Sequence, residues 1–497
     1  AVGSASGSQN EQPHFRKAPK SPAEKVAAGA ERVEFRRGLR YARGMSNDAL
    51  DWASVTAEAT RIFKDLLRID TTNPPGNEID AARYIAEILD REGIEYKIVE
   101  REPTRANLVA RLRGSGKGGG PLLLNGHLDV VPADRERWEH DPFGGVEAGG
   151  AIWGRGAIDM KNMVAMSLMS LLLLKRRGSA LDRDVIFAAV ADEEAGSRNG
   201  SLFLVEEHPE LVRAEYVLNE VGGHTLHMGG ARFYPIQVSE KGTCWFEITA
   251  EGEPGHGSMP HPRNAVVRLS RALAALGSAR LPQHNTPVVE AFLKKLAEHI
   301  PFPQNKILPL LLSPVLSGPL LDLLEKQSLE QAIGLNALLR NTASPTMLEA
   351  GRKVNVIPST ASARIDGRVL PGQTREDFLR EIERVVGEGI TITVFQHHEG
   401  SVFRADTPLF DRVCRTLERH DPGCIPVPYM IPGFTDAFAY KKLGATCYGF
   451  SPVRLPPDLN FTRMYHGHNE RIPADGFAWG LRVLYEVVRD FCSPEGR

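Results

Sequence analysis

The chain has 497 residues, 42% of them hydrophobic and 25% charged, which is an ordinary globular composition and enough chain for two or more domains. Lysine and arginine number 60 against 62 aspartates and glutamates, and the net charge of -2 gives no reason to expect a nucleic-acid or anionic-membrane partner. The five cysteines include no Cys-x-x-Cys pair, which argues against a disulfide framework or a thiolate zinc site.

Residues 1–44 differ from the rest, because they are rich first in Gly, Ser, Pro and Gln and then in Arg, with no apolar stretch suited to a signal peptide. We interpret them as a disordered leader, whether natural or added to the protein, in preference to an Arg-rich targeting segment. Met45 is a candidate for the natural start of the chain. Of the longest later apolar runs, 163–174 is too short to cross a bilayer and 307–324 is interrupted by prolines. We therefore expect a soluble, cytoplasmic protein with no stable membrane insertion.

The first half of the chain alternates helical and strand patterns. Helices are predicted at 52–67, around 85–89, at 163–174 and at 201–207, and strands at 96–99, 108–112, from 122, at 185–190 and at 216–218. This alternation predicts an α/β fold with a mixed, largely parallel sheet sandwiched by helices.

The pattern changes after about residue 240. Strands at 244–252, 361–369 and 390–395 alternate with helices at 264–276 and 374–386, as in a small ferredoxin-like α+β unit with one open sheet face. A helical, Leu- and Pro-rich insert interrupts this unit at about 282–345, and the earlier pattern resumes near 406. We therefore predict a discontinuous domain of residues 45–239 and 401–497, and a second domain of residues 240–400.

Acids and imidazoles follow several of the predicted apolar strands. In α/β sheets ligands bind outside the carboxyl ends of strands. Taken singly, a strand-end histidine is usually a satisfied surface or core residue, and a glutamate pair is usually solvated. Several such coincidences in one chain weaken that interpretation. The candidate residues are His127, Asp129, Asp159, Glu193, Glu194, Glu220 and His466.

Imidazoles and carboxylates without cysteine are suitable ligands for zinc or a similar divalent ion. Two metals about 3.5–4 Å apart need a bridging carboxylate, and they would activate a water for amide hydrolysis. Such a site also needs a base that is not itself a ligand. Adjacent Glu193 and Glu194 could supply one of each, because neighbouring side chains leave an extended backbone in different directions.

The ordered motifs from about residue 55 to the C-terminal region resemble the dinuclear zinc metallopeptidase family of aminoacylase, carnosinase, glutamate carboxypeptidase and succinyl-diaminopimelate desuccinylase. They are "NGHLDVVP", "WGRGAIDMKN", "ADEEAG", "LNEVGG", "GHGSMP" and "HGHNERI". "SEKG", "PFPQN", "KVNVIP", "PGQT" and the helical insert are most similar to the carboxypeptidase S and N-fatty-acyl amino acid hydrolase branch.

The resemblance implies that the site holds two divalent ions. We expect these to be zinc, with cobalt or manganese as alternatives. Asp159 would bridge them, His127 and Glu220 would complete one site, and Glu194 and His466 the other. The Asp159–Met160 bond would be a cis non-proline peptide.

Two further residues acquire roles by the same resemblance. Asp129 would accept the second ring N–H of His127, and Glu193 would be the general base that takes a proton from the bridging water. His466 is preferred over His468 because it lies four residues before Glu470, as in the family motif, although both histidines could reach a strand-end cleft.

Residues 240–400 resemble the family's lid and dimerisation domain, which implies a homodimer. His256 matches a histidine that reaches the partner's active site and stabilises the oxyanion, although between two glycines it could be a simple turn residue. Asn355 and Arg368 match substrate-binding positions, and a guanidinium suits a carboxylate, although Arg368 could also be a surface charge on a strand. Gly433 and Thr435 match a loop that lines the substrate site.

The insert has two interpretations: core or subunit packing, which helical apolar stripes usually indicate, or an apolar cover over an acyl group. The predicted function is a zinc-dependent hydrolase of carboxypeptidase or aminoacylase type that cleaves N-acyl amino acids or short peptides with a free C-terminal carboxylate. The alternatives are a dipeptidase or aminopeptidase that recognises a free α-amine, and a metal-free binding homologue.

Overall fold

The protein was analysed as a computed structural model that describes residues 50–459 and 461–494. The described residues from Asp51 onward belong to one compact unit, and the expected leader at 1–44 lies outside the described residues. Within the described ranges, none of the helices combines the length and apolar character that crossing a membrane requires.

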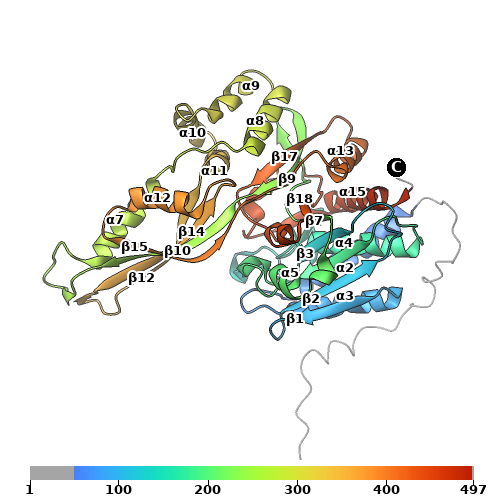
Figure 1. Ribbon diagram of the computed structural model, residues 1–497, viewed down its shortest axis with the longest axis horizontal. Coiled ribbons are helices and arrows are strands. Elements are labelled where there is room, and N and C mark those ends of the chain that lie inside the picture. The colour runs from blue at the N-terminus through green and yellow to red at the C-terminus, as the bar shows by residue number, and fades with distance from the viewer. Residues whose placement is uncertain (1–49, 460, 495–497) are drawn as a thin grey trace, which may run out of the picture. The chain divides into compact units, whose positions relative to one another are not determined.

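A ten-stranded sheet forms the larger part of this unit, with the strand order β1-β2-β6-β3-β7-β18-β9-β16 and with β17 and β8 also paired to β9 (Figure 1). The central strands β6, β3, β7 and β18 run parallel, and antiparallel pairs flank them. The predicted α/β class, with a largely parallel central sheet flanked by helices, is confirmed. The strands are β1 (Tyr96–Glu100), β2 (Ala106–Leu112), β3 (Leu122–His127), β6 (Val185–Val190), β7 (Tyr216–Asn219), β8 (Leu226–Met228), β9 (Ala231–Glu240), β16 (Ser401–Val402), β17 (Ile425–Ile431) and β18 (Thr446–Gly449).

Helix α4 (Lys161–Arg176) is the most buried helix of this part, since every residue from Lys161 to Leu174 is buried. It packs on β3 and β6 and is covered in turn by α2 and α15. A helix that is apolar on all sides needs partners on all sides, which this arrangement provides. The surrounding helices are α2 (Trp52–Arg68), α3 (Glu78–Glu92), α5 (Ser201–Glu207), α6 (Pro209–Val212), α13 (Pro408–His420), α14 (Ala437–Tyr440) and α15 (Ala474–Cys492).

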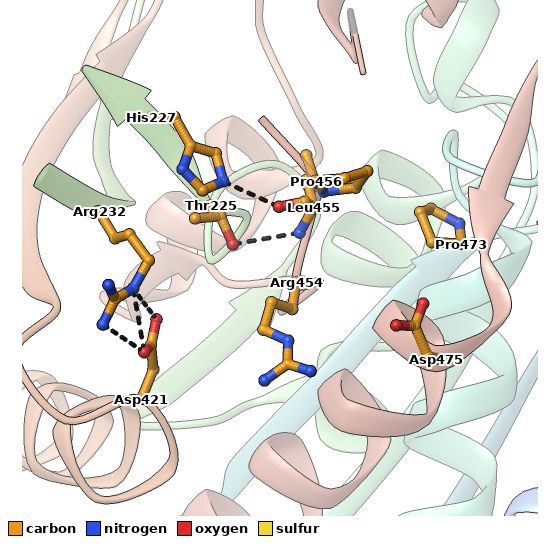
Figure 2. Close-up of a pocket in the computed structure, with 9 residues that line it drawn as sticks. All are labelled: Thr225, His227, Arg232, Asp421, Arg454, Leu455, Pro456, Pro473 and Asp475. Atoms are coloured by element: carbon orange, nitrogen blue, oxygen red, sulfur yellow. Dashed lines mark hydrogen bonds and ion pairs between the residues drawn. The ribbon is translucent and has the colours of Figure 1, made fainter. Parts of the chain in front are cut away.

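A three-stranded sheet accompanies the large one, with β5 (Ala151–Trp153) between β4 (Val146–Ala148) and β19 (Arg471–Pro473). Its strand β19 directly follows the segment with His466. On the β8–β9 side of the large sheet, a surface pocket of about 410 Å³ is lined by polar and proline side chains (Figure 2). Arg232 and Asp421 are paired there at 2.8 Å. None of the predicted site residues lines this pocket.

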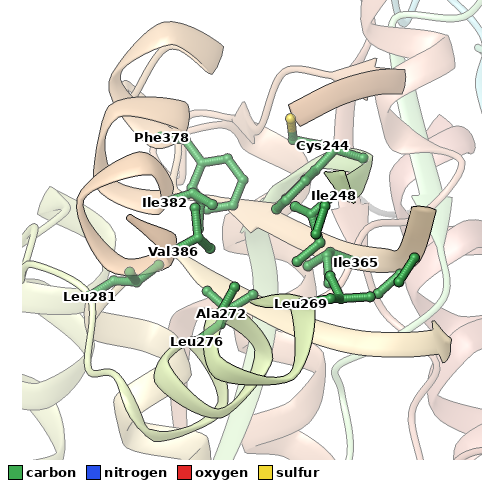
Figure 3. Close-up of a cluster of buried hydrophobic side chains, with 14 of the residues drawn as sticks. Cys244, Ile248, Leu269, Ala272, Leu276, Leu281, Ile365, Phe378, Ile382 and Val386 are labelled. Atoms are coloured by element: carbon green, nitrogen blue, oxygen red, sulfur yellow. The ribbon is translucent and has the colours of Figure 1, made fainter. Parts of the chain in front are cut away.

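The smaller part is a four-stranded antiparallel sheet with the order β12-β14-β10-β15. With helices α7 and α12 it follows the chain order β-α-β-β-α-β of ferredoxin-like units. The helices bury one sheet face in a core that includes Ile248, Leu269 and Phe378 (Figure 3). The elements are β10 (Gly242–Glu251), α7 (Ala265–Ser278), β12 (Thr342–Ala350), β14 (Thr360–Val369), α12 (Arg375–Val386) and β15 (Ile390–His398).

The segment between α7 and β12 is helical and packs against the large sheet. Its inner apolar side chains share a core with Phe233, Val427 and Met430 of β9 and β17. Its outer surface remains apolar, since Phe302 and Val315 are 78% and 79% exposed. Packing therefore accounts for the inner face of the insert only. The helices are α8 (Pro287–His299), α9 (Gln304–Ile307), η3 (Leu308–Leu312), α10 (Ser317–Glu325) and α11 (Leu329–Leu339).

The backbone crosses between the two sheets at points that lie together. Lys241 alone separates β9 from β10, and its buried ammonium donates to the Arg340 carbonyl at 2.6 Å. Gln283 forms a bridge with Arg340, so the segments entering and leaving the insert also meet there. After β15 the chain returns through Gly400, which passes close to the end of β9, since a Cβ added to Gly400 would lie 2.9 Å from the Glu240 carbonyl. All four crossings therefore converge at one place.

Candidate metal centre

His127 is the last residue of β3 and its side chain is fully buried. The preceding Gly126 allows α4 to approach the strand, since a Cβ there would lie 2.7 Å from Val164. The Nδ1 atom of His127 lies 2.9 Å from the Asp129 backbone carbonyl, which can only accept, so Nδ1 carries the proton. In the neutral ring this leaves the Nε2 lone pair free for a ligand.

Two groups of side chains meet at Asp159. The His127 Nε2 atom lies 3.0 Å from Asp159 Oδ1 and 3.6 Å from Glu220 Oε2. The His466 Nε2 atom lies 3.3 Å from Asp159 Oδ2 and 3.1 Å from Glu194 Oε2. Within each group the possible ligand atoms lie within 4.8 Å of one another. Asp159 thus offers one oxygen to each group, and in the described part of the chain His468 belongs to neither.

Burial gives these carboxyl groups unusual proton affinities. Burial and the charge of Asp159 raise the pKa of Glu194 to about 7, and burial, with Asp159 adding to it, raises the pKa of Glu220 to about 8. Burial and the charge of Glu220 raise the pKa of Glu193 well above its usual range. For Asp159 burial acts in the same direction, but hydrogen bonds from His127 and His466 outweigh it and lower its pKa.

The residues fit divalent cations. The Glu194 Oε1 atom is buried and has no hydrogen-bond partner in the described structure, so it can accept a further ligand. Several acids that crowd one buried place raise one another's pKa values and need positive charge to ionise together. The nitrogen and oxygen donors, without sulfur, suit zinc and also cobalt or manganese.

Asp129 holds the backbone of the Glu193–Glu194 pair. Its carboxylate accepts the N–H of Glu193 at 3.1 Å and that of Glu194 at 3.2 Å, and it also accepts from the Asn73 side chain at 2.8 Å. The Asp129 carboxylate lies 3.5 Å from His127 Nδ1, whereas the Asp129 backbone carbonyl lies 2.9 Å from the same nitrogen. The main acceptor of the ring N–H is therefore that carbonyl, and the Asp129 carboxylate chiefly shapes the neighbouring loop.

The expectation that Glu193 and Glu194 leave an extended backbone is wrong. They lie in a short 3-10 helix, η2 (Glu193–Ala195), after Asp192, which has a φ of 68°. This left-handed conformation is stabilised by Arg105, which donates to the Asp192 carboxylate at 2.8 Å. The Glu193 side chain is buried in this turn.

Two predicted residues of the smaller part are exposed and have no recorded contact with the acids among the described residues. His256 lies in β11 (Gly255–His256), paired with β13 (Val356–Ile357), and its Nδ1 atom lies 2.7 Å from Ser258 Oγ. The Asn355 carbonyl accepts the N–H of Gly257 at 2.9 Å. His256 and Asn355 are therefore neighbours on one loop pair.

Arg368 is held by an acid and an aromatic ring. Its Nε and Nη2 atoms donate to Asp366 at 2.7 and 3.0 Å, and its guanidinium lies 5.2 Å from the Phe434 ring centre. The Asp366 carboxylate also accepts from Trp245 at 2.8 Å. Nη1 is buried without a partner in the described structure, so the end of the guanidinium has unused hydrogen-bond capacity.

Gly433 and Thr435 lie after β17 beside the strand crossing. The Gly433 carbonyl accepts the N–H of Lys241 at 3.1 Å. The Thr435 hydroxyl donates to the buried Glu240 carboxylate at 2.8 Å. Both polar groups are therefore engaged by the crossing, and any contribution to a ligand would come from the loop's position.

The sequence analysis missed several side chains that contact this centre. Glu470 accepts the N–H of Asp159, and Asn73 donates to Asp129. Asp436, on the loop after Thr435, accepts from Asn125 at 3.0 Å beneath the strand ends. Glu470 stands inside the quoted motif "HGHNERI", and Asp436 directly follows the predicted residue Thr435, whereas nothing in the sequence around Asn73 indicates its contact.

The chain is similar to known proteins over most of its length. The profile described as "Peptidase family M20/M25/M40" matches residues 123–490. The N-fatty-acyl-amino acid synthase/hydrolase PM20D1 of Homo sapiens is 30% identical over 411 residues, which are 80% of this chain and 78% of that protein. Aminoacylase-1 of Sus scrofa is 28% identical over 447 residues, 87% and 95% of the two chains. The M20 family metallo-carboxypeptidase Sso-CP2 from Sulfolobus solfataricus is similar in fold, with a TM-score of 0.67 at 18% identity over 87% of this chain and 98% of that chain.

Proposed function

The chain belongs to peptidase family M20/M25/M40, as its motifs predicted, and from this premise we propose that it is a dinuclear metal-dependent hydrolase of N-acyl amino acids. Hydrolysis of an amide bond follows from the family and from the relatives. The finer proposal is that the amide joins an acyl group to an amino acid, or to the last residue of a short peptide, whose carboxylate is free.

One observation carries the proposal: two ligand groups share Asp159, which turns a different oxygen toward each. We assign His127, Asp159 and Glu220 to one divalent ion, and Asp159, Glu194 and His466 to the other. Zinc is the first choice and cobalt or manganese the alternatives. When bound, such ions would polarise the scissile carbonyl and lower the pKa of the attacking water.

Glu193 is proposed as the general base. It lies beside Glu194 but takes part in neither ligand group, so its carboxylate is free to move a proton. Burial and the nearby Glu220 raise its pKa in the metal-free protein, and the positive charge of bound cations would favour its ionised form, which is the form that accepts a proton. Glu193 would take a proton from the attacking water and deliver it to the leaving amine nitrogen.

The substrate's carboxylate is assigned to Arg368. Asp366 occupies the Nε edge of the guanidinium, which leaves Nη1 and the outer hydrogen of Nη2 for end-on binding of a carboxylate. Asn355, and the loop of Gly433 and Thr435, are proposed to line the same substrate.

His256 is proposed to act in a partner subunit. Its side chain is exposed and has no recorded contact with the acids of its own chain within the described residues. We therefore propose a homodimer formed through the four-stranded sheet, in which each His256 donates to the oxyanion in the partner's site.

A second candidate is a dipeptidase or aminopeptidase that recognises a free α-amine, because Arg368 would also bind the carboxylate of a dipeptide. N-acetyl-Leu, N-oleoyl-Phe and Ala-Leu, compared at one concentration of zinc-loaded protein, separate the two. Release of Leu or Phe from the acylated substrates is expected. Cleavage of Ala-Leu alone would establish the second candidate. A protein that binds neither zinc nor cobalt and cleaves none of the three would be a binding homologue.

A further inference from the structure

Glu470 holds, through one carboxylate, the backbone that carries Asp159. Its side chain is fully buried, and its Oε1 atom accepts the N–H groups of Ile158 at 2.6 Å and Asp159 at 3.1 Å. Its Oε2 atom accepts from the N–H of Gly156 at 3.1 Å and from Arg155 Nη1 at 2.6 Å. An ionised carboxylate only accepts, so it satisfies all four donors. A residue 311 positions away thus fixes the shape of the Asp159 loop.

Arg155 joins the same carboxylate to the turn that carries His466. While Nη1 binds Glu470, Nη2 donates to the Gly467 carbonyl at 2.9 Å. The Gly154 N–H donates to the Glu470 carbonyl at 3.1 Å, which fastens the two segments a second time. His466 has a φ of 56°, a conformation that a histidine keeps only where its surroundings impose it.

We propose that Glu470 and Arg155 are positioning residues that set the separation of Asp159 from His466, and thereby the affinity of the Asp159–Glu194–His466 group for its cation. This inference rests on the proposed function, because it presumes that the two groups bind divalent ions. Glu470 touches no ligand side chain and acts through the backbone of Asp159 and the turn at His466.

The effect falls mainly on this group of ligands. His127 ends strand β3 and Glu220 directly follows strand β7, and within the described structure neither accepts a hydrogen bond from Arg155 or donates one to Glu470. Glu194 is anchored separately, by the Asp129 carboxylate. The contact of His466 with Asp159 depends on the Arg155–Glu470 pair at both ends, whereas the contact of His127 with Asp159 depends on it at the Asp159 end alone. Loosening the pair therefore weakens one cation site more than the other.

Glu470→Gln tests this in the full chain. Each carboxylate oxygen receives two donors, so the amide NH₂ of glutamine must face N–H groups in either orientation. Zinc titration of metal-free protein against a competing chelator should show a second equivalent bound about 10–100-fold more weakly, the range typical for residues behind metal ligands. The affinity for the first equivalent of zinc should change far less. Glu486→Gln, a buried glutamate of α15 paired with His420, is the matched control and should leave both equivalents unchanged.

Arg155→Lys provides a second variant if Glu470→Gln does not fold. Lysine keeps the charge beside Glu470 but cannot reach both Glu470 and Gly467, so the same selective loss is expected. If both variants bound two equivalents of zinc with wild-type affinity, or bound both equivalents equally more weakly, the positioning role would be overturned while the proposed function stayed intact. A wild-type chain that binds none of zinc, cobalt and manganese would instead overturn the proposed function itself.

Discussion

The Asp129 carboxylate accepts the backbone N–H of Glu193 at 3.1 Å, across 64 positions of sequence. The residue proposed as the base is thus fixed from β3, the strand that ends in His127. A base held through its backbone keeps its carboxylate free for proton transfer.

Replacing Glu193 with glutamine should therefore remove proton transfer and leave the ligands in place. Glu193→Gln is expected to lower kcat by about 10²–10⁴-fold, the contribution of general acid–base catalysis, with unchanged zinc content. Steady-state kinetics with elemental analysis checks both quantities. Glu206→Gln, on the exposed side of α5, is the control and should keep wild-type turnover. Unchanged kcat in Glu193→Gln would refute the assignment of the base.

Cation binding should release protons. The raised pKa values of Glu194, about 7, of Glu220, about 8, and of His466, about 10, mean that these groups hold protons near pH 7 without metal, whereas cations bind only the deprotonated forms. Zinc affinity is therefore expected to rise with pH throughout the range from about pH 6 to pH 8. Calorimetry in two buffers of different ionisation enthalpy measures the protons released. Affinity independent of pH over this range would contradict the proposed ligands.

Arg368→Met should lower kcat/KM for substrates with a free carboxylate. Losing a hydrogen-bonded charge costs about 1.5–3 kcal/mol, so kcat/KM should fall by about 10–100-fold. The same substrate with a C-terminal amide should be poor for the wild type and equally poor for the variant. Arg364→Met, on the same strand but more exposed, is the control. If the variant still prefers the carboxylate, another residue binds it.

His256→Ala should lower kcat by about 10²–10³-fold, as when one oxyanion donor is removed. If His256 acts in the partner, mixing His256→Ala with Glu193→Gln chains should restore activity. Half of the dimers would be mixed, each with one complete site, which gives about a quarter of wild-type activity. Activity after subunit exchange is the measurement. A mixture no more active than its components, despite verified exchange, would place His256 outside the partner's site.

A prediction away from the centre concerns Glu486. Burial raises its pKa, but hydrogen bonds from His420 and Arg482 outweigh burial and lower the pKa from 4.5 to about 2. A lowered pKa adds stability above pH 4.5 that disappears as the pH falls toward 2, about 3 kcal/mol unscreened and about 1–2 kcal/mol with solvent screening. Thermal unfolding of Glu486→Gln should show a lower midpoint at pH 7 and a difference from wild type that shrinks below pH 4.5. A constant difference down to pH 2.5 would contradict the linkage.

Strand ends made much of this arrangement predictable. The strand 185–190 has the bounds that its apolar run predicts, and His127 and Glu220 follow apolar runs whose parallel pairing brings them to one edge. The backbone of Glu193 and Glu194 was not predictable, because the left-handed Asp192 depends on Arg105 from a distant strand. The role of Glu470 was likewise hidden, since all its donors belong to a loop more than 300 positions away and leave no local pattern.

The convergence of the four backbone crossings has a mechanical consequence. Because the crossings meet at one place, a rotation of one sheet against the other would concentrate its torsion changes around Lys241 and Gly400. The proposed ligands all lie outside residues 240–400, whereas His256, Asn355 and Arg368 all lie within them. Substrate recognition could therefore be gained, lost or altered in evolution by reshaping residues 240–400, without disturbing the part of the chain proposed to hold the cations.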